Sequence, residues 1–119
     1  PVLEACADGT LDQVDIQWKD DASVCVVAAS GGYPGSYEKD KEISGINDAE
    51  SAVEDMVVFH AGTSLSDGKL VTNGGRVLGI TALGQDIEKA IAKAYTGTKH
   101  ISFDGMVFRE DIGAKALNR

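Results

Sequence analysis

The chain is organised around residues 71–84, Val71-Thr72-Asn73-Gly74-Gly75-Arg76-Val77-Leu78-Gly79-Ile80-Thr81-Ala82-Leu83-Gly84. This stretch joins an apolar, β-branched run to a Gly-Gly-Arg turn, and a second apolar run follows. A Gly-Gly pair lets the backbone adopt positive φ and approach a ligand or another strand closely. Arginine offers a planar fork of donors that suits phosphate or carboxylate. Two interpretations stay open here: a tight turn between two strands with a surface arginine, which Gly-Gly primarily signals, or an anion-binding turn.

The composition is that of one acidic domain. The chain has 119 residues, of which 43% are apolar and 25% charged, and its formal net charge is −8. That is enough chain for one core, and the charge argues against nucleic acid or anionic membrane as a partner. No apolar run approaches the roughly 18 residues of a membrane helix. Two cysteines, Cys6 and Cys25, are too few for a disulfide framework, so we predict buried thiols and a cytoplasmic setting.

Hydrophobic periodicity predicts about seven short strands. Val14, Ile16 and Trp18 alternate with polar residues, which predicts a half-buried strand. Residues 24–29 are apolar on both parities and predict a central strand covered on both sides. The Asp-Gly pairs at 67–68 and 104–105 predict hairpins. The remaining predicted strands are residues 42–43, 56–63, 69–72, 76–83, 101–103 and 106–108.

One clear helix is predicted over residues 85–95. Gly97 is expected just beyond its end, where glycine commonly terminates helices. Residues 1–7 are expected to be the end of a helix, residues 47–55 a solvated helical turn or loop, and residues 109–118 a closing segment packed through Ile112 and Leu117. The fold class predicted is α+β: a mainly antiparallel sheet or small barrel with one packed amphipathic helix. The apolar stripe of that helix comprises Ile87, Ala90, Ile91, Ala94 and Tyr95.

The residues alone assemble no catalytic set and no metal site. Neither the phosphate-loop pattern nor the dinucleotide-loop pattern occurs. His60 could serve as a general base or ligand, but a hydrogen-bonded structural histidine is the favoured interpretation. Three glycine-marked loops, at 31–35, 62–63 and 74–75, each follow an apolar strand. They could meet along one edge and form a shallow polar site around Arg76.

Four motifs in a specific order carry a family resemblance. They are GYPGSY at 32–37, VFHAGT at 58–63, VTNGGRVL at 71–78 and REDIGAKA at 109–116. Over residues 18–117 this series resembles the C-terminal region of phosphoribosylamine–glycine ligase (glycinamide ribonucleotide synthetase), a purine-biosynthesis enzyme of the ATP-grasp superfamily. The resemblance implies that ATP, glycine and 5-phosphoribosylamine give ADP, phosphate and glycinamide ribonucleotide. Glycine would be activated as an acyl phosphate, with Mg²⁺ present.

The resemblance also implies a domain organisation. Residues 1–13 would end the ATP-grasp core, and residues 14–119 would form a substrate-wall domain. ATP and Mg²⁺ would be bound mainly by upstream ATP-grasp domains of the same enzyme, so the chain is expected to be an inactive fragment by itself. Asp40 and Glu110 depart from the family pattern, which has glycine and a basic residue there. The small-molecule substrate would contact Arg76, Gly75, Gly74, Thr63, His60, Gly31 and Gly32.

Two alternatives belong to other functional classes. Lys69 lies beside the Asp67-Gly68 turn, as a lipoyl- or biotinyl-carrying lysine would in a carrier or binding module, although the usual flanking residues are missing. The Gly-Gly-Arg turn could also serve folding alone, in a structural scaffold. Replacing Arg76 in the complete enzyme separates this last alternative from the ligase interpretation.

Overall fold

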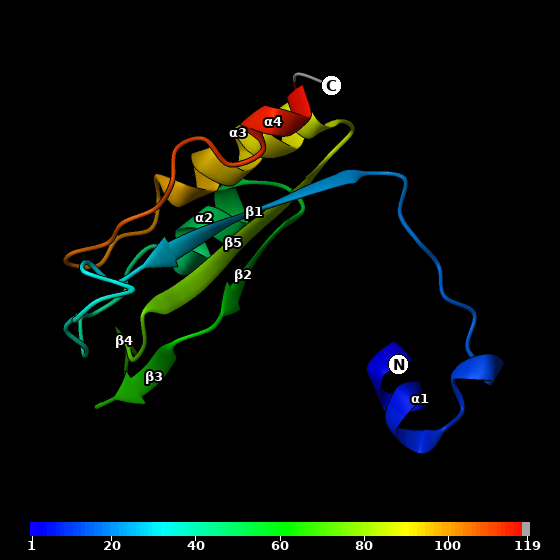
Figure 1. The fold of residues 1–119 in the computed structure, drawn as a ribbon, viewed down its shortest axis with the longest axis horizontal. Coiled ribbons are helices and arrows are strands. Elements are labelled where there is room, and N and C mark those ends of the chain that lie inside the picture. Colours follow the sequence, from blue (N-terminus) through cyan, green and yellow to red (C-terminus); the bar gives the residue numbers. More distant parts are fainter. Residues whose placement is uncertain (118–119) are drawn as a thin grey trace.

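Strand β5 (Arg76–Gly84) is the centre of the main sheet in the computed structural model, which describes residues 1–117. It pairs antiparallel with β1 (Ala22–Ala29) on one side and with β2 (Met56–His60) on the other. Figure 1 shows these three strands side by side, with the helices α2, α3 and α4 near them. β5 is the central strand because it pairs on both sides, and its residues from Val77 to Gly84 are all buried or half-buried.

A second, two-stranded sheet follows β2. β3 (Thr63–Ser66) and β4 (Lys69–Thr72) form an antiparallel hairpin in which Ser66 faces Lys69. The turn residues Asp67 and Gly68 have φ of 51° and 78°. Positive φ at both central residues matches the twist of a two-residue hairpin, which is why Asp-Gly is favoured there. The predicted hairpin at 67–68 is confirmed.

The helices cover one face of the main sheet. α3 (Ile87–Thr98) begins at Asp86, whose carboxylate accepts a hydrogen bond from the Lys89 amide at 2.8 Å. α2 (Ile46–Ala52) contacts both α3 and β2, and α4 (Ala114–Leu117) packs on α3. The residues between helices and sheet form the core: Val24, Val26, Ala28, Ile43, Ala49, Val53, Met56, Val58, Val77, Leu78, Ile80, Ala82, Ala90, Ala94, Ile101 and Phe103.

The N-terminal arm stands apart from this body. α1 (Val2–Asp8) ends at Gly9, which adopts φ 72°, and contacts the short helix η1 (Leu11–Gln13). Figure 1 shows both joined to β1 by an extended segment. Helix at the N-terminus is confirmed, but the predicted strand through Val14, Ile16 and Trp18 is wrong. A strand needs a hydrogen-bonded neighbour, and no neighbour pairs with this segment within residues 1–117; Trp18 is 87% exposed.

The α+β class and antiparallel pairing are confirmed, and the described residues form open sheets instead of a closed barrel. They hold five strands, fewer than predicted, because residues 42–43 and 101–108 make only isolated bridges to other segments. β1 is an edge strand covered on one face, so the central position predicted for it is wrong. Cys25 alternates onto its open face and is exposed, as is Cys6 on α1. The prediction of two buried thiols is therefore wrong.

Two details near the C-terminus also differ from prediction. Gly97 lies inside α3, not beyond its end. A Cβ at this position would overlap the end of the Met56 side chain, so glycine here allows close packing against β2. A sequence pattern cannot distinguish this use of glycine from a helix end. Ile112 is packed against the core as predicted, whereas Leu117 is half exposed. Asn118, predicted to close the chain, lies outside the described residues.

Candidate functional site

A β-bulge decides where Arg76 points. Along the ladder between β1 and β5, Ala28 faces Leu78 but Ala29 faces Arg76, so Val77 is an extra residue on β5. Without it, Arg76 would share the helix-covered face of Leu78, two residues away. The bulge shifts the alternation by one residue and places Arg76 on the opposite, open face. The guanidinium is thereby kept out of the core.

The three glycine-marked loops meet around this arginine. The Ser30 hydroxyl donates to the Gly74 carbonyl at 2.7 Å, and the Ser30 amide donates to the Gly75 carbonyl at 2.7 Å. The Asn73 amide donates to the Gly62 carbonyl at 2.7 Å. A Cβ added to Gly62 would lie only 2.9 Å from the Gly74 Cα. The backbones of these two loops can therefore pack against each other because both residues are glycine. These contacts bring loops from three distant parts of the chain together at one end of the main sheet, where β5 begins.

Arg76 lines a hollow of about 580 Å³ at this end of the main sheet. Gly74 and Gly75 form part of its wall, and the Tyr33 ring lies against Gly75 so closely that a Cβ there would overlap it. Within residues 1–117, Arg76 makes no salt bridge, and its side chain is exposed. The other residues lining this hollow are Val27, Phe59, Ala61, Gly62, Asn73, Leu78 and Gly79.

A second arginine lies near but is already occupied. Arg109 shares an adjoining apolar hollow with Arg76. Its Nε and Nη2 donate to the Asp111 carboxylate at 2.9 and 2.7 Å. These hydrogen bonds hold the pKa of the exposed Asp111 carboxyl below its ordinary value. Because Asp111 uses the fork of Arg109, Arg76 is the better placed of the two to receive an external anion.

The structure separates the other predicted residues from Arg76. His60 alternates with Phe59 and therefore lies on the helix-covered side, where it lines a hollow beside α2. Its Nδ1 is 3.0 Å from the Thr63 hydroxyl, so these two predicted residues pair with each other. Gly31 lines a third hollow. Gly32 serves the turn itself, with φ 97° and no room for a Cβ beside the Ser36 carbonyl.

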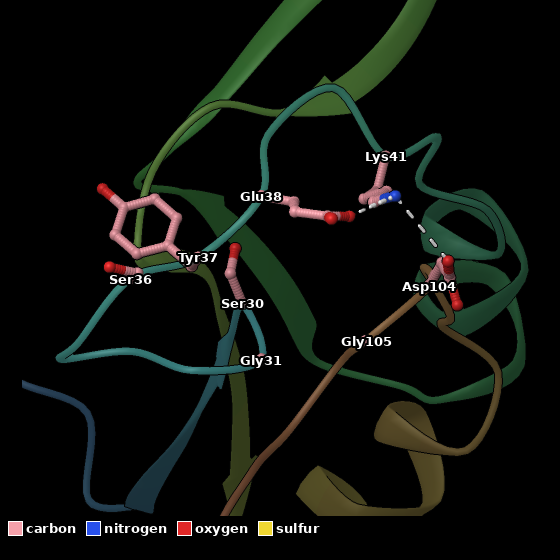
Figure 2. A pocket seen from close by; sticks show the side chains of 8 residues that line it. All are labelled: Ser30, Gly31, Ser36, Tyr37, Glu38, Lys41, Asp104 and Gly105. Atoms are coloured by element: carbon pink, nitrogen blue, oxygen red, sulfur yellow. Dashed lines mark ion pairs between the residues drawn. The ribbon is translucent and has the colours of Figure 1, made fainter.

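Sequence reasoning missed the third hollow, which Figure 2 shows from close by. The Lys41 ammonium lies between two carboxylates there, 2.8 Å from Glu38 and 3.8 Å from Asp104. The hydrogen bond from Lys41 lowers the pKa of Glu38, and the same contact raises the pKa of Lys41. The three-residue spacing of Glu38 and Lys41 could have suggested their ion pair. The contact with Asp104 could not be foreseen, because Asp104 is distant in the sequence. Asp40, which departs from the pattern that the resemblance implies, adopts φ 63°, a region that aspartate tolerates.

Replacing Ser30 with alanine tests whether the meeting of the loops is held by its hydroxyl. Ser30 is buried and its hydroxyl bonds the Gly74 carbonyl, so we expect the free energy of unfolding to fall by about 1 to 3 kcal/mol. Ser64→Ala is the matched control, because that hydroxyl is exposed and its change should stay within about 0.5 kcal/mol. Urea unfolding of the 119-residue chain measures both. Equal losses would show that the Ser30 hydroxyl does not hold the loops.

Within residues 1–117, no group of three or more histidine, cysteine, aspartate or glutamate side chains is arranged to hold a metal ion. Among these residues, no helix combines the length and the apolar character needed to cross a bilayer.

Comparison with known proteins gives concordant matches. The family model for the phosphoribosylglycinamide synthetase C domain matches residues 23–115. Phosphoribosylamine–glycine ligase of Synechocystis sp. is 57% identical over 117 residues, which are 98% of this chain and 27% of that protein. The enzyme of the same name from Agrobacterium fabrum is 48% identical over 100% of this chain and 27% of its own length. The chain thus spans about a quarter of the curated relatives it matches.

A solved structure agrees with these matches. The crystal structure of phosphoribosylamine–glycine ligase from Thermotoga maritima superposes with a TM-score of 0.65 at 43% sequence identity. The superposition covers 75% of this chain and 21% of that one. The similarity therefore extends from the sequence to the three-dimensional arrangement of the elements.

Proposed function

The chain belongs to the phosphoribosylglycinamide synthetase C-domain family, and from this we propose that it forms one wall of the substrate cleft of a phosphoribosylamine–glycine ligase. The complete enzyme would join glycine to 5-phosphoribosylamine at the expense of ATP, in purine biosynthesis. ATP and Mg²⁺ would be bound mainly by its other domains, which are the partners of this one. Both cysteines are free thiols, in keeping with a cytoplasmic enzyme.

The observation that carries this proposal is Arg76, which lies on the open face at the start of β5 and has no salt-bridge partner among residues 1–117. The 5-phosphoribosylamine substrate carries a phosphate, and a guanidinium binds phosphate with two parallel hydrogen bonds. The chain has a net charge of −8, so an anion needs a local positive group to approach. Gly74 and Gly75 form part of the wall beside the guanidinium, where their missing side chains leave room for Gly62 and for the Tyr33 ring.

The proposed domain division places residues 1–13 with the ATP-grasp core and residues 14–119 with the wall. One observation supports it. α1 contacts η1, and both stand apart from the main sheet in Figure 1. The matched family model begins at residue 23, close to the start of β1 at Ala22, so it covers the sheet body and leaves residues 14–22 outside.

The carrier alternative gains no specific support. Lys69 begins β4, and its ammonium is 3.9 Å from the Glu42 carboxylate. Both side chains are largely exposed, so the contact is a weak surface ion pair, as is common for lysines on hairpins.

A chimera tests the ligase proposal. We define the full-length chimera as the Synechocystis ligase in which this chain replaces the 117 matched residues. We expect it to release ADP only when glycine and 5-phosphoribosylamine, generated in situ, are both present. The 119-residue chain alone, and the Synechocystis ligase lacking the matched region, should release none. A folded, monodisperse chimera without activity, or a fully active truncated ligase, would overturn the proposal.

A further inference from the structure

The two faces of the main sheet differ sharply in chemistry. One face is buried under α2 and α3, through residues such as Val26, Val58 and Ile80. The other face is open. Among the strand residues that face this side, Arg76 at the end of β5 is charged and the others are not. The residues of this open face are Ser23, Cys25, Val27, Ala29, Val57, Phe59, Gly79, Thr81 and Leu83.

Large apolar side chains on the open face are in contact with solvent. Val27 is 41% exposed, Val57 47% and Phe59 57%. Val107, which bridges to Ala29, continues the apolar surface beyond β1 and is also exposed. By contrast, the outer side of α3 carries the exposed charges of Glu88 and Lys89. A largely apolar surface, with Arg76 at its end, in a chain with 11 basic and 19 acidic residues is typical of a covered interface.

We propose that this open face docks onto the remaining domains of the same ligase. The proposal rests on the proposed function, because it takes those domains as the occupant. The curated relatives are almost four times as long as this chain, so most of their mass lies outside it.

The N-terminal arm supports this choice of occupant. The arm joins the main sheet at Ala22, the first residue of β1. β1 is an edge strand of that sheet and contributes side chains to the open face. Along the arm, Leu3, Ile16 and Trp18 are exposed. A domain lying beside β1 would cover apolar side chains of the arm and of the open face together.

Docking also changes the Arg76 hollow. Val27, Phe59 and Gly79 belong both to the open face and to the wall of that hollow. A domain seated on the face would therefore turn an open surface hollow into a cleft between two domains. Excluding water strengthens the interaction between a guanidinium and an anion, because the local dielectric constant falls. Arg76 would then act at a domain boundary.

Cys25 is a native reporter for this docking, since it is exposed on the open face midway along β1. We would treat the full-length chimera with N-ethylmaleimide under native conditions and follow the Cys25 peptide by mass spectrometry. The matched control is the thiol introduced by Ala92→Cys on the exposed side of α3. Rates are normalised to the urea-denatured chimera. We expect Cys25 to react at least tenfold more slowly than the control thiol.

A second variant tests that the interface causes the protection. Val57→Ser removes an exposed apolar side chain of the open face that does not line the Arg76 hollow, and it should raise the Cys25 rate several-fold. Equal rates for Cys25 and the control thiol, or no effect of Val57→Ser, would overturn the docking proposal. So would protection that disappears on dilution together with a dimer seen by light scattering. An active chimera with a fast-reacting Cys25 would overturn docking while leaving the ligase function intact.

Discussion

Replacing Arg76 with alanine in the full-length chimera is expected to lower kcat/KM roughly 30- to 900-fold, or about 2 to 4 kcal/mol of transition-state stabilisation. The reason is the position of the guanidinium. The bulge at Val77 places it on the open face, and no carboxylate among residues 1–117 pairs with it. Its removal would leave a substrate phosphate without its charged donor in a cleft from which water is excluded.

Two controls make this experiment specific. Arg76→Lys keeps the charge but loses the planar fork, so it should recover only part of the lost kcat/KM. Arg109→Ala removes a neighbouring arginine whose donors already bond Asp111, and it should change kcat/KM less than about threefold. Steady-state kinetics with varied 5-phosphoribosylamine measures all three variants, and urea unfolding checks that each is folded. Unchanged kcat/KM for Arg76→Ala would support the scaffold alternative instead.

Replacing Gly45 with alanine is expected to cost about 3 kcal/mol of folding free energy. Gly45 precedes α2 with φ 93°, a conformation that alanine adopts only with strain. A Cβ there would also overlap the carbonyl oxygen of His100, which belongs to the segment after α3. The neighbouring Ser44 and Ser102 exchange backbone hydrogen bonds of 2.9 Å, so the two segments cannot separate without losing both.

Gly68→Ala separates the two parts of this cost. Gly68 has φ 78° at the tip of the β3–β4 turn, and a Cβ there would meet nothing within 4 Å. Its replacement should therefore cost only the conformational part, about 1 kcal/mol. Urea unfolding of the 119-residue chain, followed by circular dichroism, measures both variants. Equal losses at Gly45 and Gly68 would show that the close approach to His100 contributes nothing.

Features that depend on neighbouring residues were predictable. The Asp67-Gly68 hairpin was identified because the two residues that must adopt positive φ are themselves the signal. The helix of residues 85–95 was identified from its apolar stripe, and Ala90 and Ala94 are indeed buried. The same reasoning failed for Val14, Ile16 and Trp18, because alternation shows that a strand is possible without showing which segment pairs with it.

The candidate site was predictable only in part. The three glycine-marked loops were each visible in the sequence, and hydrogen bonds of Ser30 and Asn73 bring them together. Their grouping with His60 was not supported by the geometry, because His60 and Phe59 project to opposite faces of β2. The contact of Lys41 with Asp104 was invisible to sequence reasoning, since 63 positions separate the two residues.

By itself, the sequence determined the family, the α+β class, the long helix, the hairpin turn and the glycine loops. Each of these depends on residue types within a few positions, or on an ordered series of such motifs. Only the tertiary structure decided that β5 is central, that β1 is an edge strand and that Arg76 points away from the core. The physical reason is that a side chain's face is set by strand pairing, and one extra residue, Val77, reverses the alternation.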